Sequence, residues 1–301
     1  MEKKVIGDLT VESSLKIVSV IDKDTYGYGF VSSNNNDYNL EKSYMKKTCT
    51  LKHAENLERE LKTMLHFRAN PFIVQASCPH LHFECNTKSA TLCYIYMEYA
   101  SLGNLDKMIS DAGGRLPEDS VRRATRMILQ GLKALHAEGY LHCDLKPSNV
   151  FVFPSSRPGE PWDLKLTGFG LSKDPTMDTS LLFPGYPKER MPPEADYIVG
   201  APERLIGPAS DVWSLGCTVL KMFGAIPLPP VAEYFWQRCS ERQPTDRATV
   251  DELLEHPFVS EKPSSFLEVS FFNKEQSYII HDELIPKYPD PFGLYNVNIC
   301  E

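Results

Sequence analysis

Residues 141–150, with the sequence LHCDLKPSNV, bring several chemically capable side chains into one short stretch. His142 and Asp144 are two residues apart. Lys146 follows two residues after the aspartate, and Asn149 follows five residues after it. A carboxylate placed near an ammonium and an amide can move a proton and neutralise a charged group. Residues 141–150 are therefore the first candidate for a catalytic site.

A second stretch, residues 78–85 with the sequence CPHLHFEC, contains two cysteines and two histidines, which are residue types that bind zinc. If this stretch is a strand, alternation places Cys78, His80 and His82 on one face and Cys85 on the other. This separation favours a strand followed by a turn over a metal site.

The first stretch resembles the catalytic loop of the protein kinases. Further kinase-like motifs follow it in order: GFG at 168–170, APE at 201–203, SDVWSLGC at 210–217, and Arg247 before HPF at 256–258. Upstream, residues 96–105 (YMEYASLGNL) resemble a kinase hinge in which Met97 is the gatekeeper at the back of the adenine site. The resemblance extends over about residues 15–258, and within the family the chain is most similar to plant Ser/Thr kinases of the mitogen-activated protein kinase kinase kinase type.

The patterning of hydrophobic residues agrees with the fold that this resemblance implies. Short β-branched or aromatic runs predict strands at 15–21, 42–47, 72–74 and 91–96, and helical spacing predicts helices at 53–67, 117–139, 211–222, 231–239 and 249–254. We therefore expect an α+β protein with the two-lobed kinase fold. Residues 1–98 form a small β-rich N-lobe, residues 99–258 a larger α-helical C-lobe, and residues 259–301 a C-terminal tail packing on the body.

The resemblance assigns catalytic roles to three residues of the loop. Asp144 matches the base that accepts the proton of the substrate hydroxyl, and Lys146 matches the lysine that stabilises the transferring phosphoryl group. Asn149 matches the ligand of one Mg²⁺ ion. Three further residues match structural positions of the family: Glu203 and Arg247 as a buried ion pair, and Asp211 as the helix residue that braces the catalytic loop.

The resemblance also implies an ion pair in the N-lobe. Lys46 matches the strand lysine that contacts ATP, with the adjacent Lys47 as the competing assignment. Glu60 is the better match to the helix glutamate that pairs with this lysine, and Glu58 is the weaker one. If Lys46 is the match, alternation turns Tyr44 toward the nucleotide, where its ring would fill the place of the purine above Phe151. If Lys47 is the match, Met45 takes that position instead.

Two parts of the ATP site depart from the family. The aspartate of the DFG motif, the main ligand for the Mg²⁺ that bridges the ATP phosphates, is Gly168 here. Asp163 lies nearby in sequence as a substitute, although it precedes the loop. In the phosphate-binding loop, Asp22 and Asp24 replace two glycines and Gly27 is kept. Both carboxylates would repel a triphosphate unless the loop swings outward and leaves them in solvent.

Regulatory features depart as well. The arginine of the His-Arg-Asp motif, which orders a phosphorylated activation loop, is Cys143, a thiol we expect to be inert beside an acidic neighbour. The segment between Met222 and Arg238 is too short for the usual substrate-docking helix. Residues 174–195 carry only four hydroxyls, Thr176, Thr179, Ser180 and Tyr186. The sequence leaves open whether another kinase phosphorylates Thr176, Thr179 or Ser180.

Composition narrows the class of protein further. The 301 residues carry 32 Lys and Arg against 40 Asp and Glu, giving a formal charge of −8, so a broad nucleic-acid-binding face is not expected. No stretch approaches the roughly 18 apolar residues of a membrane span. The eight cysteines are scattered rather than arranged as a disulfide framework, which predicts a reduced, intracellular protein. We expect it in the cytoplasm, with the nucleus as the alternative.

The losses indicate a pseudokinase that acts as a signalling scaffold, decoy or allosteric partner of a kinase or an immune receptor, without a cofactor. The alternative is a weak Ser/Thr kinase that uses Asp144, Lys46 and Asn149 with ATP and one Mg²⁺ ion or none. Under that alternative Glu60, Gly27 and Met97 complete the nucleotide site.

Overall fold

The structure is a computed structural model of residues 1–301. It describes residues 43–85, 91–177, 192–193, 206–224 and 227–260, together with the backbone of four strands before residue 35. The predicted tail lies outside the described residues from position 261 onward.

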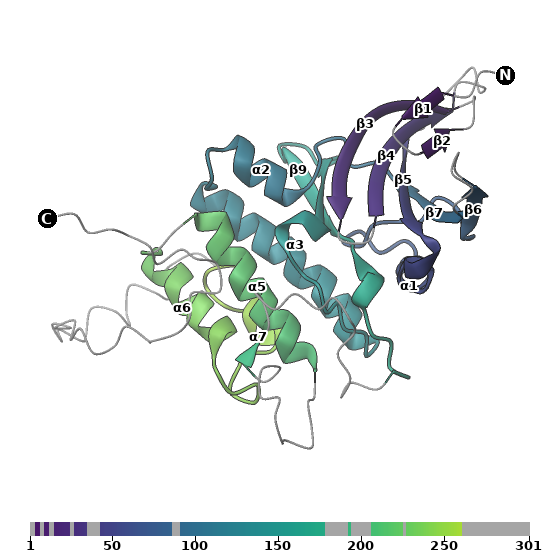
Figure 1. Ribbon diagram of the computed structural model, residues 1–301. Helices are drawn as coiled ribbons and strands as arrows, with labels where there is room; N and C mark the ends of the chain where they lie inside the picture. Colours follow the sequence, from purple (N-terminus) through teal and green to yellow (C-terminus); the bar gives the residue numbers. More distant parts are fainter. Residues whose placement is uncertain are drawn as a thin grey trace, which may run out of the picture.

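A five-stranded antiparallel sheet forms the N-terminal part of the molecule (Figure 1). Its strands lie in the order β3-β4-β5-β7-β6, and β1 and β2 form a separate antiparallel pair. The strand bounds are β1 (Lys4–Ile6), β2 (Leu9–Val11), β3 (Leu15–Asp24), β4 (Gly27–Asn34), β5 (Ser43–Thr50), β6 (His82–Cys85) and β7 (Thr91–Glu98). Strand β5, which carries Lys46 and Lys47, is therefore the central strand of the sheet, between β4 and β7.

Helix α1 (Ala54–His66) contacts β5 and β7 of this sheet and is entered through a short 3-10 turn, Leu51–His53. Leu57, Leu61 and Met64 are spaced to share one side of the helix, and all three are buried. Burying such a side chain contributes about 1.5–3 kcal/mol, so this stripe fixes which side of α1 faces the sheet. Glu60 shares that buried side.

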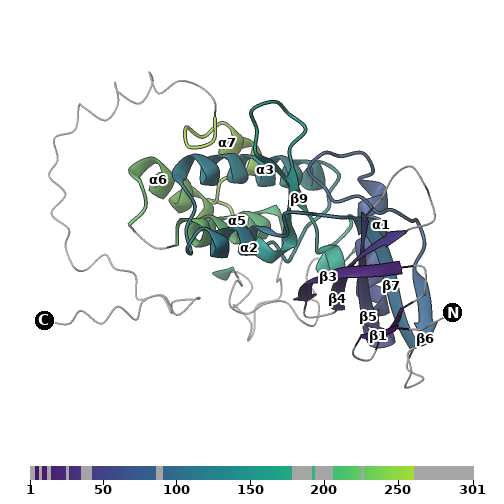
Figure 2. The ribbon, with the colours of Figure 1, turned by 90° about the horizontal axis from the view of Figure 1, so that it is seen from above.

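Helices make up the C-terminal part and lie at the opposite end of the molecule from the sheet (Figures 1 and 2). Their bounds are α2 (Leu105–Asp111), α3 (Glu118–Ala137), α5 (Pro208–Phe223), α6 (Pro230–Ser240) and α7 (Val250–Leu254). The long helix α3 contacts α5, α7 and strand β9, and α5 contacts α6. Val121, Leu132 and Leu135 of α3 are completely buried, so this helix is the centre of the C-terminal core.

A two-stranded hairpin of β8 (Val150–Pro154) and β9 (Trp162–Leu166) follows the catalytic-loop sequence. A single turn of 3-10 helix, Pro147–Asn149, leads into β8, and a second, Phe169–Leu171, follows β9. The hairpin therefore sets the positions of Asn149 at its start and of Gly168 just after its end.

The structure confirms the expected fold class and the expected helices, with differences of a few residues at their ends. The predicted strand at 72–74 is wrong: within it Ile73 makes an isolated parallel bridge to Leu166 and no ladder follows. The segment meets β9 only at Leu166, the last residue of that strand, where the Val74 N–H donates to the Leu166 carbonyl at 2.9 Å and the Leu166 N–H to the Phe72 carbonyl at 2.8 Å. Among the described residues, no helix combines the length and hydropathy needed to cross a bilayer.

Candidate functional site

The loop at residues 141–144 is anchored by a buried aspartate of helix α5. Asp211 accepts hydrogen bonds from the backbone N–H groups of His142 and Cys143, both at 2.9 Å, and from the ring of His136 at 2.9 Å. Burial would raise the pKa of Asp211, but the hydrogen bonds, led by that from His136, outweigh it and hold the pKa below its usual value. The predicted bracing role of Asp211 is confirmed.

These bonds also hold Cys143 in a left-handed conformation, with φ of 62°. Its side chain is buried beside Leu141, Leu171 and Ile206. Burial, followed by the charge of Asp211, raises the pKa of the Cys143 thiol well above its ordinary value. The thiolate is the reactive form, so the prediction that Cys143 is inert agrees with its surroundings.

Two polar residues of the catalytic-loop sequence, Lys146 and Asn149, converge on the carboxylate of Asp144. Lys146 Nζ lies 2.9 Å from Asp144 Oδ2, and Asn149 Nδ2 donates to the same oxygen at 2.9 Å. Asn149 Nδ2 also donates to the backbone carbonyl of Asp144 at 2.8 Å. The predicted grouping of Asp144, Lys146 and Asn149 is therefore present, and the carboxylate is engaged by both neighbours.

In the N-lobe, the lysine that pairs with Glu60 is Lys47. Lys47 Nζ lies 2.8 Å from Glu60 Oε2, in a pair that is almost completely buried. Lys46 points to the other face of the sheet, where Nζ lies 2.8 Å from Glu84 and 3.7 Å from the centre of the Tyr94 ring. The expectation that Lys46 pairs with Glu60 is wrong, because strand alternation sends adjacent lysines to opposite faces and Lys47 is the one turned toward α1.

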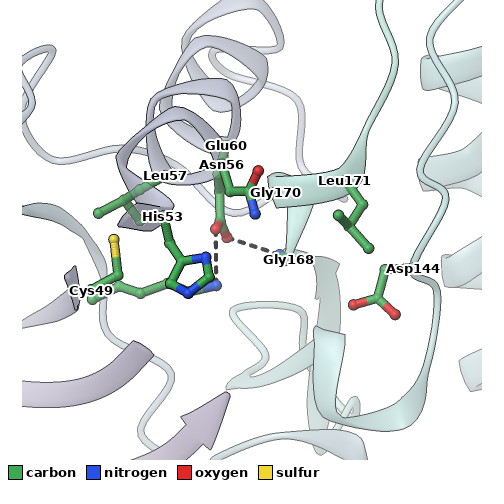
Figure 3. Close-up of a pocket in the computed structure, with 10 residues that line it drawn as sticks. Cys49, His53, Asn56, Leu57, Glu60, Asp144, Gly168, Gly170 and Leu171 are labelled. Carbon is green, nitrogen blue, oxygen red and sulfur yellow. Dashed lines mark hydrogen bonds and ion pairs between the residues drawn. The ribbon is translucent and has the colours of Figure 1, made fainter. Parts of the chain in front are cut away.

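The weaker candidate on the helix, Glu58, forms an exposed i,i+4 pair with Lys62, so Glu60 is the correct choice of glutamate. The second oxygen of Glu60 accepts from the backbone N–H of Gly168 at 3.0 Å and from the Thr167 hydroxyl at 3.4 Å. Figure 3 shows Glu60 reaching from α1 toward Gly168, with Asp144 on the far side of the glycine. The cleft that Glu60, Gly168 and Asp144 line lies between the two lobes.

Gly168 has φ of 77°, a left-handed conformation that glycine adopts without strain. A Cβ atom on this residue would lie 2.3 Å from Asn149 Cγ and 2.5 Å from both of its terminal atoms. The amide of Asn149 therefore fills the space next to Gly168 in which a side chain at position 168 would begin. The residues present do not fit a Mg²⁺ ion held as the kinase pattern requires, because position 168 supplies no carboxylate and Asn149 occupies its place.

Asp163, the acidic residue considered as a substitute for the missing aspartate, forms ion pairs with two arginines. It lies on β9 and pairs with Arg157, with Arg123 of α3 at 3.5 Å. Partial burial raises the pKa of Asp163, but the hydrogen bond from Arg157 outweighs it and the pKa is lowered. The carboxylate of Asp163 is thus held by arginines. This agrees with the objection drawn from the sequence, that Asp163 precedes the loop and does not replace the missing aspartate.

The adenine position follows from the corrected lysine. Met45, two residues before Lys47, shares its strand face and is buried, and it lies opposite Met97 in the β5–β7 register. Tyr44 lies on the other face, opposite Glu98, so the expectation that its ring replaces the purine is wrong. Met97 and Phe151, the predicted gatekeeper and floor residue, are both buried.

Helix α1 is tied to residues 168–172 by contacts that the sequence did not reveal. Arg59 Nη1 donates to the carbonyl of Gly170 at 2.6 Å, and the hydroxyls of Thr63 and Ser172 lie 3.0 Å apart. Together with the bond from Gly168 to Glu60, these hold the helix against the start of the activation segment. The signal was the i, i+3 spacing of Glu60 and Thr63, which places two polar side chains on one buried helical face.

A second polar link between the lobes lies behind the hinge. Lys165 Nζ of β9 contacts both carboxylate oxygens of Glu98, at 2.7 and 2.8 Å. Glu98 Oε1 also accepts from the backbone N–H of Gln75 at 2.8 Å. This ion pair connects the last residue of β7 with the β8–β9 hairpin, so the hinge is fixed on the side away from α1.

His82 of the zinc-like stretch contacts an aromatic ring and a thiol. His82 stacks on Tyr94, with ring centres 5.0 Å apart, and its Nε2 lies 3.4 Å from Cys78 Sγ. Within the part of the chain that the structure describes, no cluster of three or more His, Cys, Asp or Glu residues is able to hold a metal ion. The interpretation as a strand and a turn agrees with β6.

Several predicted features fall outside the described side chains. The β3–β4 hairpin pairs Asp22 with Gly29 and Asp24 with Gly27, but the orientation of these two carboxylates is not described. Glu203 also lies outside the described residues, so its pairing with Arg247 stays a prediction. Three of the four hydroxyl residues of the segment 174–195 also lie outside the described residues: Thr179, Ser180 and Tyr186.

Arg247, the described member of that predicted pair, is buried beneath α5. Its Nη1 donates to the carbonyl of Ala209 at 2.6 Å and its Nε to that of Glu241 at 3.1 Å. Its guanidinium also lies 5.2 Å from the centre of the Trp213 ring. These contacts agree with a structural role for Arg247.

Comparison with known families decides the identity of the fold. The protein kinase domain matches residues 27–234. The chain belongs to the protein kinase domain family. This match covers the sheet from β4 onward, the hinge, the catalytic loop and helix α5, which are the elements that position the site described above.

Two plant kinases are among the proteins to which the chain is similar. Over 258 residues the chain is 29% identical to mitogen-activated protein kinase kinase kinase 17 of Arabidopsis thaliana, covering 75% of this chain and 65% of that protein. It is 32% identical over 195 residues to the kinase YODA of the same plant, covering 55% of this chain and 20% of YODA. The chain therefore spans less than two thirds of the length of either relative.

Solved structures agree on the fold. The kinase domain in a crystal structure of Rad53 kinase domain and SCD2 superimposes with a TM-score of 0.62 at 22% sequence identity, covering 84% of this chain and 90% of that one. At this identity the similarity concerns the fold alone.

Proposed function

We propose that this protein is a pseudokinase, a kinase fold that does not transfer phosphoryl groups and acts by binding other proteins. The observation that carries the proposal is the contact between Asn149 and Gly168. The residue type at 168 removes the metal-binding carboxylate, and the amide of Asn149 takes the vacated space. Phosphoryl transfer depends on positioned metal ions that neutralise phosphate charge. The loss of a metal-binding carboxylate therefore affects the transfer step itself.

The parts of the fold that hold its shape are intact and support a role as a binding protein. Lys47 and Glu60 keep α1 against the sheet, and Asp211 keeps the catalytic loop in place. We infer a scaffold, decoy or allosteric partner, acting in the cytoplasm on a kinase or an immune receptor. The proline-rich residues 174–195 and the C-terminal tail are the candidate surfaces for such a partner.

A weakly active Ser/Thr kinase is the second candidate. It is favoured by the convergence of Lys146 and Asn149 on Asp144, which is the arrangement a catalytic base requires. A chain of this kind would use ATP with atypical metal dependence, since Gly168 supplies no ligand. A third candidate, a sensor that binds ATP without turnover, keeps the nucleotide contacts of Lys47 and Met97 but not transfer.

The experiment that separates these candidates is a titration of ATP, with and without Mg²⁺, that follows the melting temperature of the full chain. Ligand at 100 times its dissociation constant stabilises a protein by about 2.7 kcal/mol, which gives a shift of several degrees. The pseudokinase proposal predicts no shift at millimolar ATP in either condition.

The matched control is Lys47→Met, compared with Lys46→Met on the opposite face of the same strand. A Mg²⁺-dependent shift that Lys47→Met abolishes and Lys46→Met keeps would contradict the proposal and identify a nucleotide-binding protein. A shift without phosphoryl transfer would assign the sensor, and transfer lost in Asp144→Ala would assign the enzyme.

A further inference from the structure

Two cysteines face each other across the middle of the N-lobe sheet. Cys49 of β5 and Cys93 of β7 are directly opposite in the antiparallel register, and their Sγ atoms lie 3.2 Å apart. Their side chains are 5% and 0% exposed, and both thiols are free. They come from positions 44 residues apart, so the fold and not the chain sequence brings them together.

The backbone geometry of such a pair suits a covalent bond. Opposed residues in antiparallel strands have Cα atoms about 4.5–5.5 Å apart, which falls within the range of about 4.4–6.8 Å found in disulfides. Both side chains project from the same face of the sheet, because directly opposed residues of an antiparallel pair share a face. Met45 and Lys47, four and two residues before Cys49, lie on that face of β5 as well. The sulfur atoms need to approach by about 1.2 Å to reach bonding distance.

We propose that Cys49 and Cys93 are a redox pair that hydrogen peroxide converts to a disulfide. In the first step the sulfur of Cys49 attacks one peroxide oxygen, the O–O bond breaks, and Cys49 becomes a sulfenic acid while one water leaves. In the second step the sulfur of Cys93 attacks the sulfenic sulfur, the S–O bond breaks and a second water leaves. Two thiols are oxidised by two electrons, and one peroxide is reduced to two waters.

The two thiols differ in how accessible they are to a small oxidant, and this difference sets the order of the two steps. Cys49 lines the cleft between the lobes with Lys47 and Glu60, and its sulfur is drawn at the edge of that cleft in Figure 3. Cys93 lies deeper in the sheet, and its Sγ contacts the carbonyl of Cys49 at 3.6 Å. A small oxidant entering the cleft therefore reaches Cys49 first, and Cys93 resolves the sulfenic acid.

The same surroundings make the reaction slow at neutral pH and faster in alkali. Burial, followed by the neighbouring Cys93, raises the pKa of the Cys49 thiol well above its ordinary value. Lys47 on the same strand opposes that shift, and Glu60 of α1 adds to it. The thiolate fraction of Cys49, and with it the rate of oxidation, rises as the pH increases.

The test is peroxide treatment of the folded full chain, followed by denaturing alkylation, trypsin and mass spectrometry. Each cysteine of the pair lies alone in its tryptic peptide, residues 48–52 and 89–107. We expect these two peptides to appear joined, with a loss of 2 Da per chain, in a yield that rises at least several-fold between pH 7 and pH 9. Reductant should release both peptides.

Cys49→Ser and Cys93→Ser should each abolish the joined species, whereas Cys143→Ser should leave it unchanged, since Cys143 is equally buried but packs against Leu141, Leu171 and Ile206. Peptide mapping of the unsubstituted chain decides the matter if a serine variant fails to fold. The proposal is overturned if the folded chain yields no joined peptide, if Cys93 pairs with Cys78 or Cys85 instead, or if the pair forms only after denaturation.

Discussion

Gly168 and Asn149 decide what the cleft is able to do, and they act together. The Cβ atom of a side chain at position 168 would lie 2.3 Å from Cγ of Asn149. The amide of Asn149 thus fills the space beside Gly168. We expect that restoring the aspartate alone does not restore the site, because the Cβ atom at 168 would overlap this amide.

We predict that Gly168→Asp lowers the free energy of unfolding by about 1–3 kcal/mol, since it combines a side chain at positive φ with overpacking against Asn149. It should give no phosphoryl transfer above the unsubstituted chain. Urea unfolding and a transfer assay check both. Gly168→Ala is the control for the added Cβ and should show a similar loss.

A double-mutant cycle tests the contact itself. Adding Asn149→Ala to Gly168→Asp should recover about 1 kcal/mol relative to the sum of the single changes. Additive losses, or full activity from Gly168→Asp alone, would show that the space beside Gly168 is open.

His256 is a buried imidazole held between aromatic rings in the C-lobe. It lies 5.0 Å from the Tyr234 ring and 5.2 Å from that of Phe235, and its Nδ1 accepts from the Phe258 N–H at 3.1 Å. Its Nε2 is buried and finds no partner among the described residues. Burial, followed by the charge of Arg238, lowers the pKa of His256 to about 4.

The folded pKa of His256 lies below the value near 6.5 of the unfolded chain, so the unfolded state binds the extra proton between these values. We predict that stability is full above pH 6.5 and falls by up to about 3 kcal/mol as the pH drops toward 4. Urea unfolding across this range should show a shallower pH dependence in His256→Gln. The exposed His80→Gln should behave like the unsubstituted chain, and an equal slope in all three would disprove the assignment.

At the scale of elements, helix α1 is the part on which both lobes depend. Its buried side presents Glu60 to Lys47 and to the Gly168 N–H, while Thr63 and Arg59 contact residues 170–172. A buried charge that loses its partner costs far more than an exposed one, so contributions along this one helix should differ sharply.

We predict that Glu60→Gln lowers the free energy of unfolding by about 3 kcal/mol, because it removes the carboxylate that lies 2.8 Å from the buried Lys47 ammonium. Glu58→Gln, two residues earlier on the exposed face, should cost under about 0.5 kcal/mol. Chemical denaturation of the two variants measures the difference. Similar losses would mean that Glu60 is not the residue that holds Lys47.

At the scale of the whole molecule, two sets of side-chain contacts hold the lobes together. Lys165 and Glu98 join them behind the hinge, and the contacts of α1 join them across the cleft. Both sets link the N-terminal sheet and helix α1 to residues 165–172 of the C-terminal part.

We predict that Lys165→Met increases the rate of hydrogen exchange at the Gln75 amide several-fold, since Glu98, the acceptor of that amide, loses the cation that orients it. The control is Lys133→Met, which removes an exposed pair with Asp251 on the C-lobe surface. Unchanged exchange at Gln75 in both variants would show that the hinge pair does not restrain this region.

Sequence reasoning succeeded where motifs are long and failed where one residue decides. The catalytic loop, helix α3 and the brace at Asp211 follow from ordered motifs and helical spacing. The choice between Lys46 and Lys47 did not, because it depends on which strand face turns toward α1, and that is fixed by pairing with β4 and β7. The contact of Asn149 with Gly168 is also invisible in sequence, since it arises from a turn after β9.

The most direct measurement of the central claim is the incorporation of labelled phosphate from the γ-position of ATP, with Mg²⁺ or Mn²⁺, into the chain itself and into a general protein substrate. We predict that the unsubstituted chain and Asp144→Ala give the same background signal. Incorporation by the unsubstituted chain that Asp144→Ala abolishes would contradict the claim and establish a working kinase.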